Sequence, residues 1–282
     1  MDPATSRKTW QTLEPFHAMI YFAPEAAEEY AAEGLDIAGN RAAAYFPARA
    51  AALGAVGPGV VQATFFNFSA LAVQFGMAGA WDVTTPAAMV EARLRVADRA
   101  LRRMCGDLLD TPDVVEALEL ARTACEGCRP EGRPIYAGLT DLDWPTPPHL
   151  QLWHAVTLLR EYRGDGHVAA LTASGLTGIR AAVLHVAQGD SWTREPLRKT
   201  RGYSTEEWDT ALGDLRQRGW IDPDSEGFTD AGRAVRQEVE DRTDVLALPP
   251  WEHLGEAGCT RLRELVRPLS KAVTDAGGLG IR

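Results

Sequence analysis

Alanine-rich stretches with apolar residues at helical spacing recur along this chain, and they limit the folds that it can adopt. Residues 85–109, TPAAMVEARLRVADRALRRMCGDLL, show the pattern most clearly. There Thr85 is a good N-cap and Pro86 suits the first helical turn. β-Branched residues seldom run together, so the sequence offers few strands. We therefore expect a mostly α-helical protein.

Charge and composition exclude several classes of protein. With 282 residues the chain can form two domains, and its net charge of −10 argues against the basic face that nucleic-acid binding requires. The N-terminus lacks the basic-then-apolar pattern of a secretion signal, and no apolar run approaches ~18 residues. Four cysteines are too few for a disulfide scaffold at this size. We expect a cytoplasmic protein that contacts neither a membrane nor nucleic acid.

Periodicity and helix-breaking residues define further elements. Residues 8–32 have helical spacing, but Pro15 and Pro24 each suit the first turn of a helix, so we expect a kink or break at both. The apolar residues 60–66 fit a buried helix better than a strand without a partner. Residues 126–149 are rich in Pro, Gly and Asp and should form a long connection. The helices expected after it cover residues 150–163, 166–174 and 177–188.

Residues 190–247 show a familiar order of elements. A helix leads to a tight turn at Gly202, and Ser204 caps a second helix that is followed by RGWI. Residues 222–229, DPDSEGFT, fit a β-hairpin wing, and a closing helix follows the wing. This framework resembles a MarR-like winged helix, a fold that does not by itself imply a function.

The charges of this segment do not suit DNA. In DNA-binding winged helices the first turn of the second helix enters the major groove. The side chains in that region are Thr205, Glu206, Glu207, Asp209 and Thr210. Residues 190–247 hold nine Lys and Arg against fourteen Asp and Glu, a net charge of −5 that phosphates repel. We favour a structural or dimerising module. The cations that keep DNA contact open are Arg198, Lys199, Arg201, Arg216 and Arg218.

Three segments together resemble one family: LEPFHAMIYFAPEA near the start, LREYRGDGHVAAL at residues 159–171, and the winged helix. It is a mainly actinobacterial group of helix-turn-helix-like proteins of about this length, and the resemblance covers nearly the whole chain. It implies a helical domain at residues 1–188, a winged-helix module at 189–247, and an extension at 248–282 with a short C-terminal helix. Since winged-helix relatives commonly pair, we also expect a homodimer.

A stripe of ionisable side chains marks the first of these segments. Glu14, His17, Tyr21 and Glu25 follow at offsets of three, four and four, so an unbroken helix would place them on one face. In a functional site, Glu14 would orient His17 as a base or ligand, and Tyr21 would donate a hydrogen bond. Alternatively, both glutamates belong to helix starts and His17 is a satisfied core residue.

The sequence predicts no metal site and specifies no cofactor. Glu14-x-x-His17 matches one half of a di-metal bundle site, but no second Glu-x-x-His occurs. A single metal held by His17 with His154 or His167 stays open without any supporting ligand spacing. Cys125-x-x-Cys128 is half of a zinc knuckle without its other half, so we expect reduced thiols.

The segment LREYRGDGHVAAL predicts a corner between two helices. The first helix should end at Gly164 as a left-handed C-cap, and Asp165 should cap the next one. His167 then lies in a first turn, where the positive helix terminus favours the neutral imidazole. Arg160 and Arg163 could hold an anionic ligand with paired hydrogen bonds. Alternatively, the corner is a solvated turn with a surface ion pair.

These features together predict a pocket for a small molecule. Trp153 and His154 lie one helix face from the corner. The N-terminal half is also crowded with aromatic residues, which serve either core packing or a mostly apolar pocket. We expect an anionic organic ligand held by Arg160, Arg163, Asp165, Trp153 and His154. If the protein is an enzyme, which the sequence leaves open, His17 or His167 is the base and both face one cavity. The alternatives are a ligand-responsive MarR-like regulator and a scaffold without a ligand.

Overall fold

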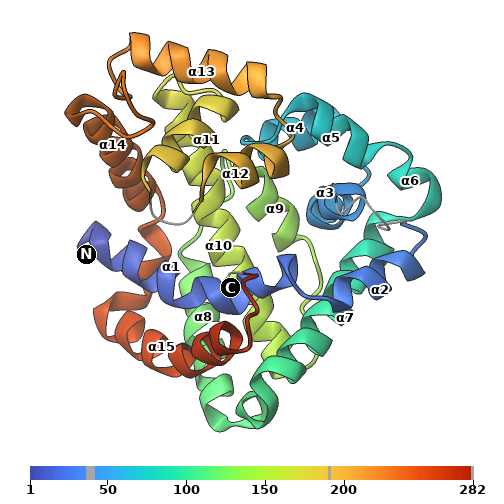
Figure 1. Ribbon diagram of the computed structural model, residues 1–282. Helices are drawn as coiled ribbons and strands as arrows, with labels where there is room; N and C mark the ends of the chain where they lie inside the picture. Colours follow the sequence, from blue (N-terminus) through green and yellow to red (C-terminus); the bar gives the residue numbers. More distant parts are fainter. Residues whose placement is uncertain (36–41, 190–191, 281–282) are drawn as a thin grey trace.

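The computed structural model describes residues 1–35, 42–189 and 192–280, and nearly all of its regular structure is helical (Figure 1). The expectation of a mostly α-helical protein is confirmed. Within those residues the only β pairing is an isolated antiparallel bridge between Ile221 and Phe228. The predicted wing is therefore a loop closed by one bridge and not a two-stranded hairpin. Each of the three predicted segments, 1–188, 189–247 and 248–282, includes a few residues outside those described.

The α-helices have the following bounds: α1 Pro3–Ala18, α2 Glu25–Ala32, α3 Ala42–Ala50, α4 Pro58–Thr64, α5 Ala70–Met77, α6 Ala80–Val83, α7 Pro86–Cys105, α8 Pro112–Glu126, α9 Pro134–Thr140, α10 Pro148–Ala173, α11 Gly178–Ala187, α12 Arg194–Arg201, α13 Thr205–Gln217, α14 Asp230–Leu246 and α15 Pro249–Asp275. Three 3₁₀ turns complete the list: η1 Met19–Tyr21, η2 Ala51–Leu53 and η3 Gly106–Asp110.

Several of these helices start where the sequence predicts. Thr85 accepts a hydrogen bond from the backbone of Ala88 at the start of α7, and residues 60–66 fall largely in α4. Pro24 directly precedes α2, but α1 continues through Pro15 to Ala18. Among the described residues, no single helix has both the length and the apolar character of a membrane span, although α10 and α11 meet the composition together across a 101° bend.

Buried side chains form two hydrophobic clusters. The larger one joins α1, α3, α7, α8, the first half of α10 and α15, with Phe16, Leu152 and Leu262 fully buried. The smaller one joins the end of α10 with α11, α12, α13 and α14 around Trp208. The clusters meet within α10, between residues 162 and 170.

The expected corner at residues 159–171 does not exist, because α10 runs unbroken from Pro148 to Ala173. Gly166 lies inside the helix, where a Cβ would stand 2.8 Å from the Arg133 guanidinium, so glycine permits this close approach. Asp165 caps a different helix: its Oδ2 accepts a hydrogen bond from the backbone N–H of Tyr136, in the first turn of α9, at 3.0 Å. Long-range contacts therefore decide a conformation that local capping rules predict incorrectly.

The C-terminal helix is long, which corrects the expectation of a short one. α15 covers Pro249–Asp275, with non-helical backbone at Gly255, and it packs beside α1 and α8 (Figure 1). Its Leu262 and Val266 are fully buried in the larger cluster. Ser270 Oγ donates to the Thr12 carbonyl at 2.7 Å, so polar contacts also join the two ends of the chain.

α12 and α13 form a helix-turn-helix unit that is fixed to the larger part of the protein. Gly202 takes the left-handed conformation in the turn, with φ of 73°, and Ser204 and Glu207 form a capping box on α13, as the sequence predicts for the turn and the cap. Ser69, the N-cap of α5, donates from its backbone N–H to the Arg201 carbonyl at 2.9 Å. Its Oγ donates to the Gly202 carbonyl at 2.7 Å. The turn therefore rests on α5.

Candidate functional site

The largest of the described cavities, here called the central cavity, lies where α10 passes from one cluster to the other. It has a volume of about 360 Å³ and is lined from α1, α3, α4, α9, α10, α11, α12, α14 and the segment between α4 and α5. Its cationic lining consists of Arg49, Arg160, Arg163, Arg201 and Arg236. Its carboxylates are Glu161, Asp165 and Glu240. Of the predicted site residues, this cavity brings together Arg160, Arg163, Asp165 and His167.

Glu161 anchors the charges on one side of the central cavity. It is 3% exposed, and Arg49 Nη2 lies 2.9 and 3.0 Å from its two oxygens. Arg160 Nη1 donates to Glu161 Oε1 at 2.8 Å. Burial alone would raise the pKa of this carboxyl, but the two guanidinium groups hold it well below its usual range. The sequence analysis proposed Arg160 but missed Glu161 and Arg49.

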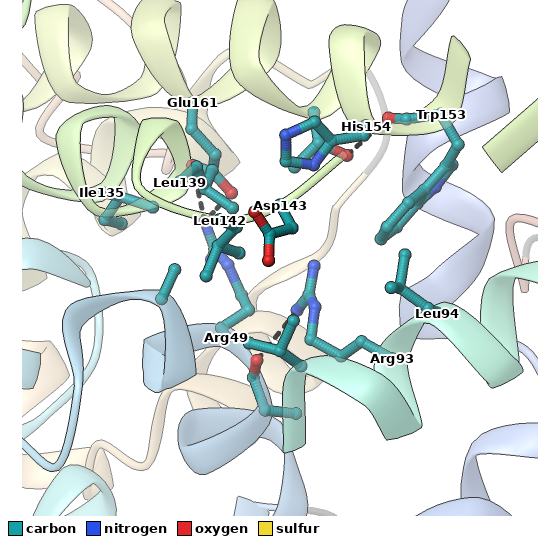
Figure 2. A pocket seen from close by; sticks show the side chains of 14 residues that line it. Arg49, Arg93, Leu94, Ile135, Leu139, Leu142, Asp143, Trp153, His154 and Glu161 are labelled. Atoms are coloured by element: carbon teal, nitrogen blue, oxygen red, sulfur yellow. Dashed lines mark hydrogen bonds and ion pairs between the residues drawn. The ribbon is translucent and has the colours of Figure 1, made fainter. Parts of the chain in front are cut away.

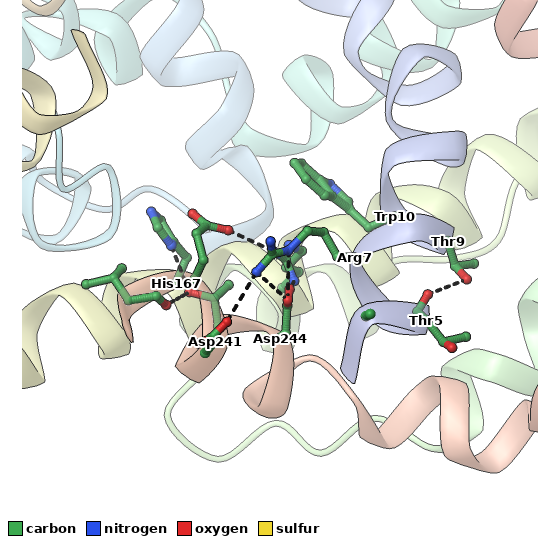
Figure 3. Close-up of polar contacts among 12 residues, drawn as sticks. Thr5, Arg7, Thr9, Trp10, His167, Asp241 and Asp244 are labelled. Carbon is green, nitrogen blue, oxygen red and sulfur yellow. Dashed lines mark hydrogen bonds and ion pairs between the residues drawn. The ribbon is translucent and has the colours of Figure 1, made fainter. Parts of the chain in front are cut away.

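α14 supplies the partners of the next polar residues along α10 (Figure 3). Arg163 Nη1 donates to Asp244 at 2.7 Å, and Arg7 of α1 pairs with the same carboxylate at 2.7 Å. His167 Nδ1 lies 2.9 Å from Thr243 Oγ1, which itself donates to the Val239 carbonyl. Nδ1 therefore carries the proton and donates to Thr243, which leaves Nε2 unprotonated.

His167 is neutral for a different reason from the one that the sequence suggested. It lies in the middle of α10 and not at a helix start, so the helix dipole is not the cause. Burial is the main cause, and it lowers the pKa of His167 to about 4. The imidazole is therefore a neutral base at pH 7, although its position in the helix was predicted incorrectly.

Arg201 differs from the other arginines of the central cavity. It is the last residue of α12, and its guanidinium lies 4.5 Å from the centre of the Phe68 ring. Arg49, Arg160, Arg163 and Arg236 each pair with a carboxylate, whereas Arg201 pairs with none within the residues that the structure describes. Burial lowers the pKa of Arg201. The sequence analysis considered this residue only as a DNA contact.

His17 does not line the central cavity, so the structure does not unite the two histidines. It is fully buried, stacks on Trp153 at 5.9 Å, and contacts Thr157 Oγ1 through Nδ1 at 2.9 Å. Thr157 and His167 stand ten residues apart on α10, which corresponds to about 15 Å along the helix axis. The expectation that His17 and His167 face one cavity is therefore wrong.

The stripe that was expected around His17 is also divided. Tyr21 lies 2.9 Å from His17 Nε2, but Glu14 accepts from Trp10 Nε1 at 2.8 Å and does not reach the imidazole. Glu25, on α2, pairs with Arg103 at 2.6 Å on the surface. Glu14 therefore does not orient His17, because its carboxylate binds Trp10 instead. Glu25 lies apart from the stripe because the chain turns between Ala18 and Glu25.

Trp153 and His154 lie on another side of α10, beside a second and much smaller space (Figure 2). This space holds about 30 Å³, the volume of a single water molecule rather than an organic ligand. Trp153 Nε1 and His154 Nε2 have no hydrogen-bond partner among the residues that the structure describes. Burial lowers the pKa of His154 to about 4. Neither residue lines the central cavity.

The described residues include no metal-binding cluster. No group of three or more His, Cys, Asp or Glu side chains among them could hold a metal ion. The four cysteines are free thiols, as expected. Burial raises the pKa of Cys128 to about 12, so this thiol is a poor nucleophile and metal ligand.

Comparison with known proteins identifies the family. A family model described as a helix-turn-helix family matches residues 6–280, almost the whole chain. The chain belongs to this helix-turn-helix family. No curated protein and no solved structure matches it.

Membership of a helix-turn-helix family directs attention to the exposed side of α13. Its first turn presents Glu206 and Glu207, and Asp209 follows on the exposed surface. Two nearby cations have carboxylate partners: Arg194 pairs with Asp209 and Glu226, and Arg198 pairs with Glu195 at 2.9 Å. Three acidic side chains therefore lie at the start of α13, the region that contacts phosphates or bases in DNA-binding helix-turn-helix proteins.

Proposed function

We propose that the protein binds a small organic anion in the central cavity, with Arg201 as the residue that pairs with its carboxylate or phosphate. One observation carries the proposal: Arg201 lines the cavity without a carboxylate partner among the described residues, while its four cationic neighbours are all paired. A guanidinium that is partly removed from water without a counter-charge costs free energy, and a bound anion offsets that cost.

The size and walls of the cavity support an organic ligand. Its volume of about 360 Å³ falls within the range of small-molecule pockets. Aromatic side chains cover part of the wall: Trp10, Tyr45, Phe65, Phe66 and Phe68. A ligand with one acidic group and an apolar or aromatic body would satisfy both kinds of surface.

If the ligand also reacts, His167 is the base of the proposed site. Its Nδ1 donates to Thr243, so Nε2 can accept a proton, and the residue lines the cavity. Among the cavity carboxyls of the described residues, Asp165 is the one whose pKa burial raises to about 6. We assign no base role to His17, which does not reach this cavity.

Thermal-shift measurement and calorimetry with a panel of aromatic carboxylates and organic phosphates test the proposal. At least one member should stabilise the wild type and bind with measurable heat. Arg201→Met should lose that response, whereas Arg218→Met should keep it. Arg218 is a matched control because it is exposed and stacks on Trp220 outside the cavity. Equal binding by the Arg201 variant, or no binding by the wild type, would refute the proposal.

A ligand-responsive DNA-binding regulator is the second candidate, and family membership favours it. Arg201 lines the cavity and directly precedes Gly202 in the turn before α13, so a ligand bound to Arg201 would contact the helix-turn-helix unit directly. A gel shift with the gene's own upstream region at about 0.15 M salt separates the candidates. Sequence-selective retardation would favour the regulator.

Dimerisation stays a prediction, and light scattering during size-exclusion chromatography would measure it.

A further inference from the structure

A third cavity, here called the alanine-lined cavity, lies between η1, α2, α3 and α7 and has a volume of about 180 Å³. Its walls are mainly alanine and other apolar side chains. Its polar groups are Tyr21, Tyr30, Tyr45, Arg49 and Arg93. Tyr45 and Arg49 also line the central cavity, so these two side chains stand between the two spaces.

A series of hydrogen bonds joins Tyr21 through His17 to Thr157 on α10, and the donor in each bond follows from Thr157. Thr157 has one hydroxyl proton, and it donates this proton to the Trp153 carbonyl at 2.7 Å. Thr157 Oγ1 must therefore accept from His17 Nδ1–H at 2.9 Å. The other imidazole nitrogen, Nε2, is then unprotonated and accepts from the Tyr21 hydroxyl at 2.9 Å.

These hydrogen bonds determine whether the Tyr21 hydroxyl can donate to a ligand or only accept from it. Burial raises the pKa of the phenol, so it keeps its proton at neutral pH. That proton is committed to His17, and the remaining lone pairs of the Tyr21 oxygen can only accept. At the alanine-lined cavity, Tyr21 is a hydrogen-bond acceptor.

The Tyr45 hydroxyl can act as a hydrogen-bond donor to a ligand. Its hydroxyl oxygen accepts from Arg49 Nη1 at 2.9 Å, and its own proton meets no acceptor among the described residues. The rings of Tyr21 and Tyr45 lie 5.8 Å apart. The polar groups of the cavity therefore include one acceptor and one donor on neighbouring rings.

We propose that the alanine-lined cavity is a separate binding site for a small apolar alcohol or phenol, held through its hydroxyl. A hydroxyl is the simple group that donates to Tyr21 and accepts from Tyr45 at the same time, and the alanine walls take the apolar body. An ether or a ketone of the same shape can accept but cannot donate, so it leaves the Tyr21 lone pair unpaired. The site requires neither Arg201 nor a ligand in the central cavity.

Calorimetric titration with 4-methylphenol and its methyl ether, 4-methylanisole, near pH 6 tests this selectivity, because tyrosine stays protonated there. The wild type should bind the phenol about tenfold more tightly than the ether, the effect of one hydrogen bond. Tyr21→Phe should abolish the preference, and Tyr203→Phe, which removes a phenol outside the cavity, should retain it. Equal affinities in the wild type, or no binding of either compound, overturn the proposal.

Thr157→Val tests the bond direction itself. Valine has nearly the shape of threonine but cannot accept from His17, so the imidazole can move its proton to Nε2 and donate to Tyr21. The Tyr21 hydroxyl would then donate into the cavity, and the preference should shift from the phenol toward the ether. Near-UV circular dichroism establishes that the variant is folded. A folded Thr157→Val protein that keeps the tenfold preference contradicts the deduced hydrogen-bond directions. Tyr45→Phe is a second variant, in which the loss of the donor should weaken phenol binding.

Discussion

Replacing Arg201 by methionine should stabilise the protein in the absence of ligand, whereas the same replacement at Arg49 should destabilise it. Both guanidinium groups line the central cavity, and both changes remove one positive charge. The two changes differ in the groups that are left beside the missing guanidinium. Arg201 leaves only the Phe68 ring behind, whereas Arg49 leaves the buried carboxylate of Glu161 with one cation in place of two.

The magnitudes follow from these partners. Removing one member of a buried ion pair costs about 3–5 kcal/mol when the other charge is left unpaired. Glu161 is only 3% exposed but keeps Arg160, so Arg49→Met should lower the free energy of unfolding by about 3 kcal/mol, the lower end of that range. Arg201→Met removes an unpaired, half-buried charge and should raise the free energy of unfolding by about 1 kcal/mol. Substitutions that stabilise a protein while removing its binding are a known mark of functional residues.

Urea denaturation followed by far-UV circular dichroism measures both effects, provided that the dependence on urea concentration is unchanged. An anion at about 100 times its Kd should add about 2.7 kcal/mol to the wild type and nothing to the Arg201 variant. If Arg201→Met destabilises the ligand-free protein as much as Arg49→Met does, Arg201 has a partner within the protein. The case for an anion site would then fail.

Three further predictions concern stability. Ser69→Ala removes both the cap of α5 and the hydroxyl that binds the Gly202 carbonyl, so it should cost about 1–2 kcal/mol in urea denaturation. Ser204→Ala removes half of the α13 capping box and should cost about 1 kcal/mol in the same assay; no change would contradict the capping geometry. Burial raises the pKa of Asp165 from 3.8 to about 6, so the folded state holds this proton more tightly. Stability should therefore fall as the pH rises from about 4 to about 6. Asp165→Asn should remove this decline and be more stable at pH 7, by up to about 3 kcal/mol; an unchanged pH profile would refute it.

Local chemistry predicted the helices well where a cap or a periodic face decides the structure. Thr85, Ser204 and Gly202 have the roles expected from their types, because N-caps and left-handed C-caps depend on neighbouring backbone alone. Gly164 and Asp165 carry the same local signals, yet α10 passes through both. Asp165 instead meets the backbone of Tyr136 in α9, a contact 29 residues away that no capping rule anticipates.

The charges of the central cavity were only partly predictable. Arg160 and Arg163 stood out by their clustering, but Glu161 between them was overlooked as an internal partner. Arg49 carried a signal that could have been used: it stands four residues after Tyr45 in a helix that is otherwise apolar, where a lone cation needs a buried partner. The sequence around Arg201 carried no such signal, because the direction of its side chain depends on how α12 packs against α5.

The pairing of α1 with α15 affects how the protein is made. α1 leaves the ribosome long before its neighbour α15, which begins only at Pro249 and ends at Asp275. The apolar side of α1, with Leu13 and Phe16, must therefore wait for almost the entire chain to be synthesised before its cover arrives. Nascent chains that stall before α15 should expose this surface and become clients of chaperones or targets for degradation.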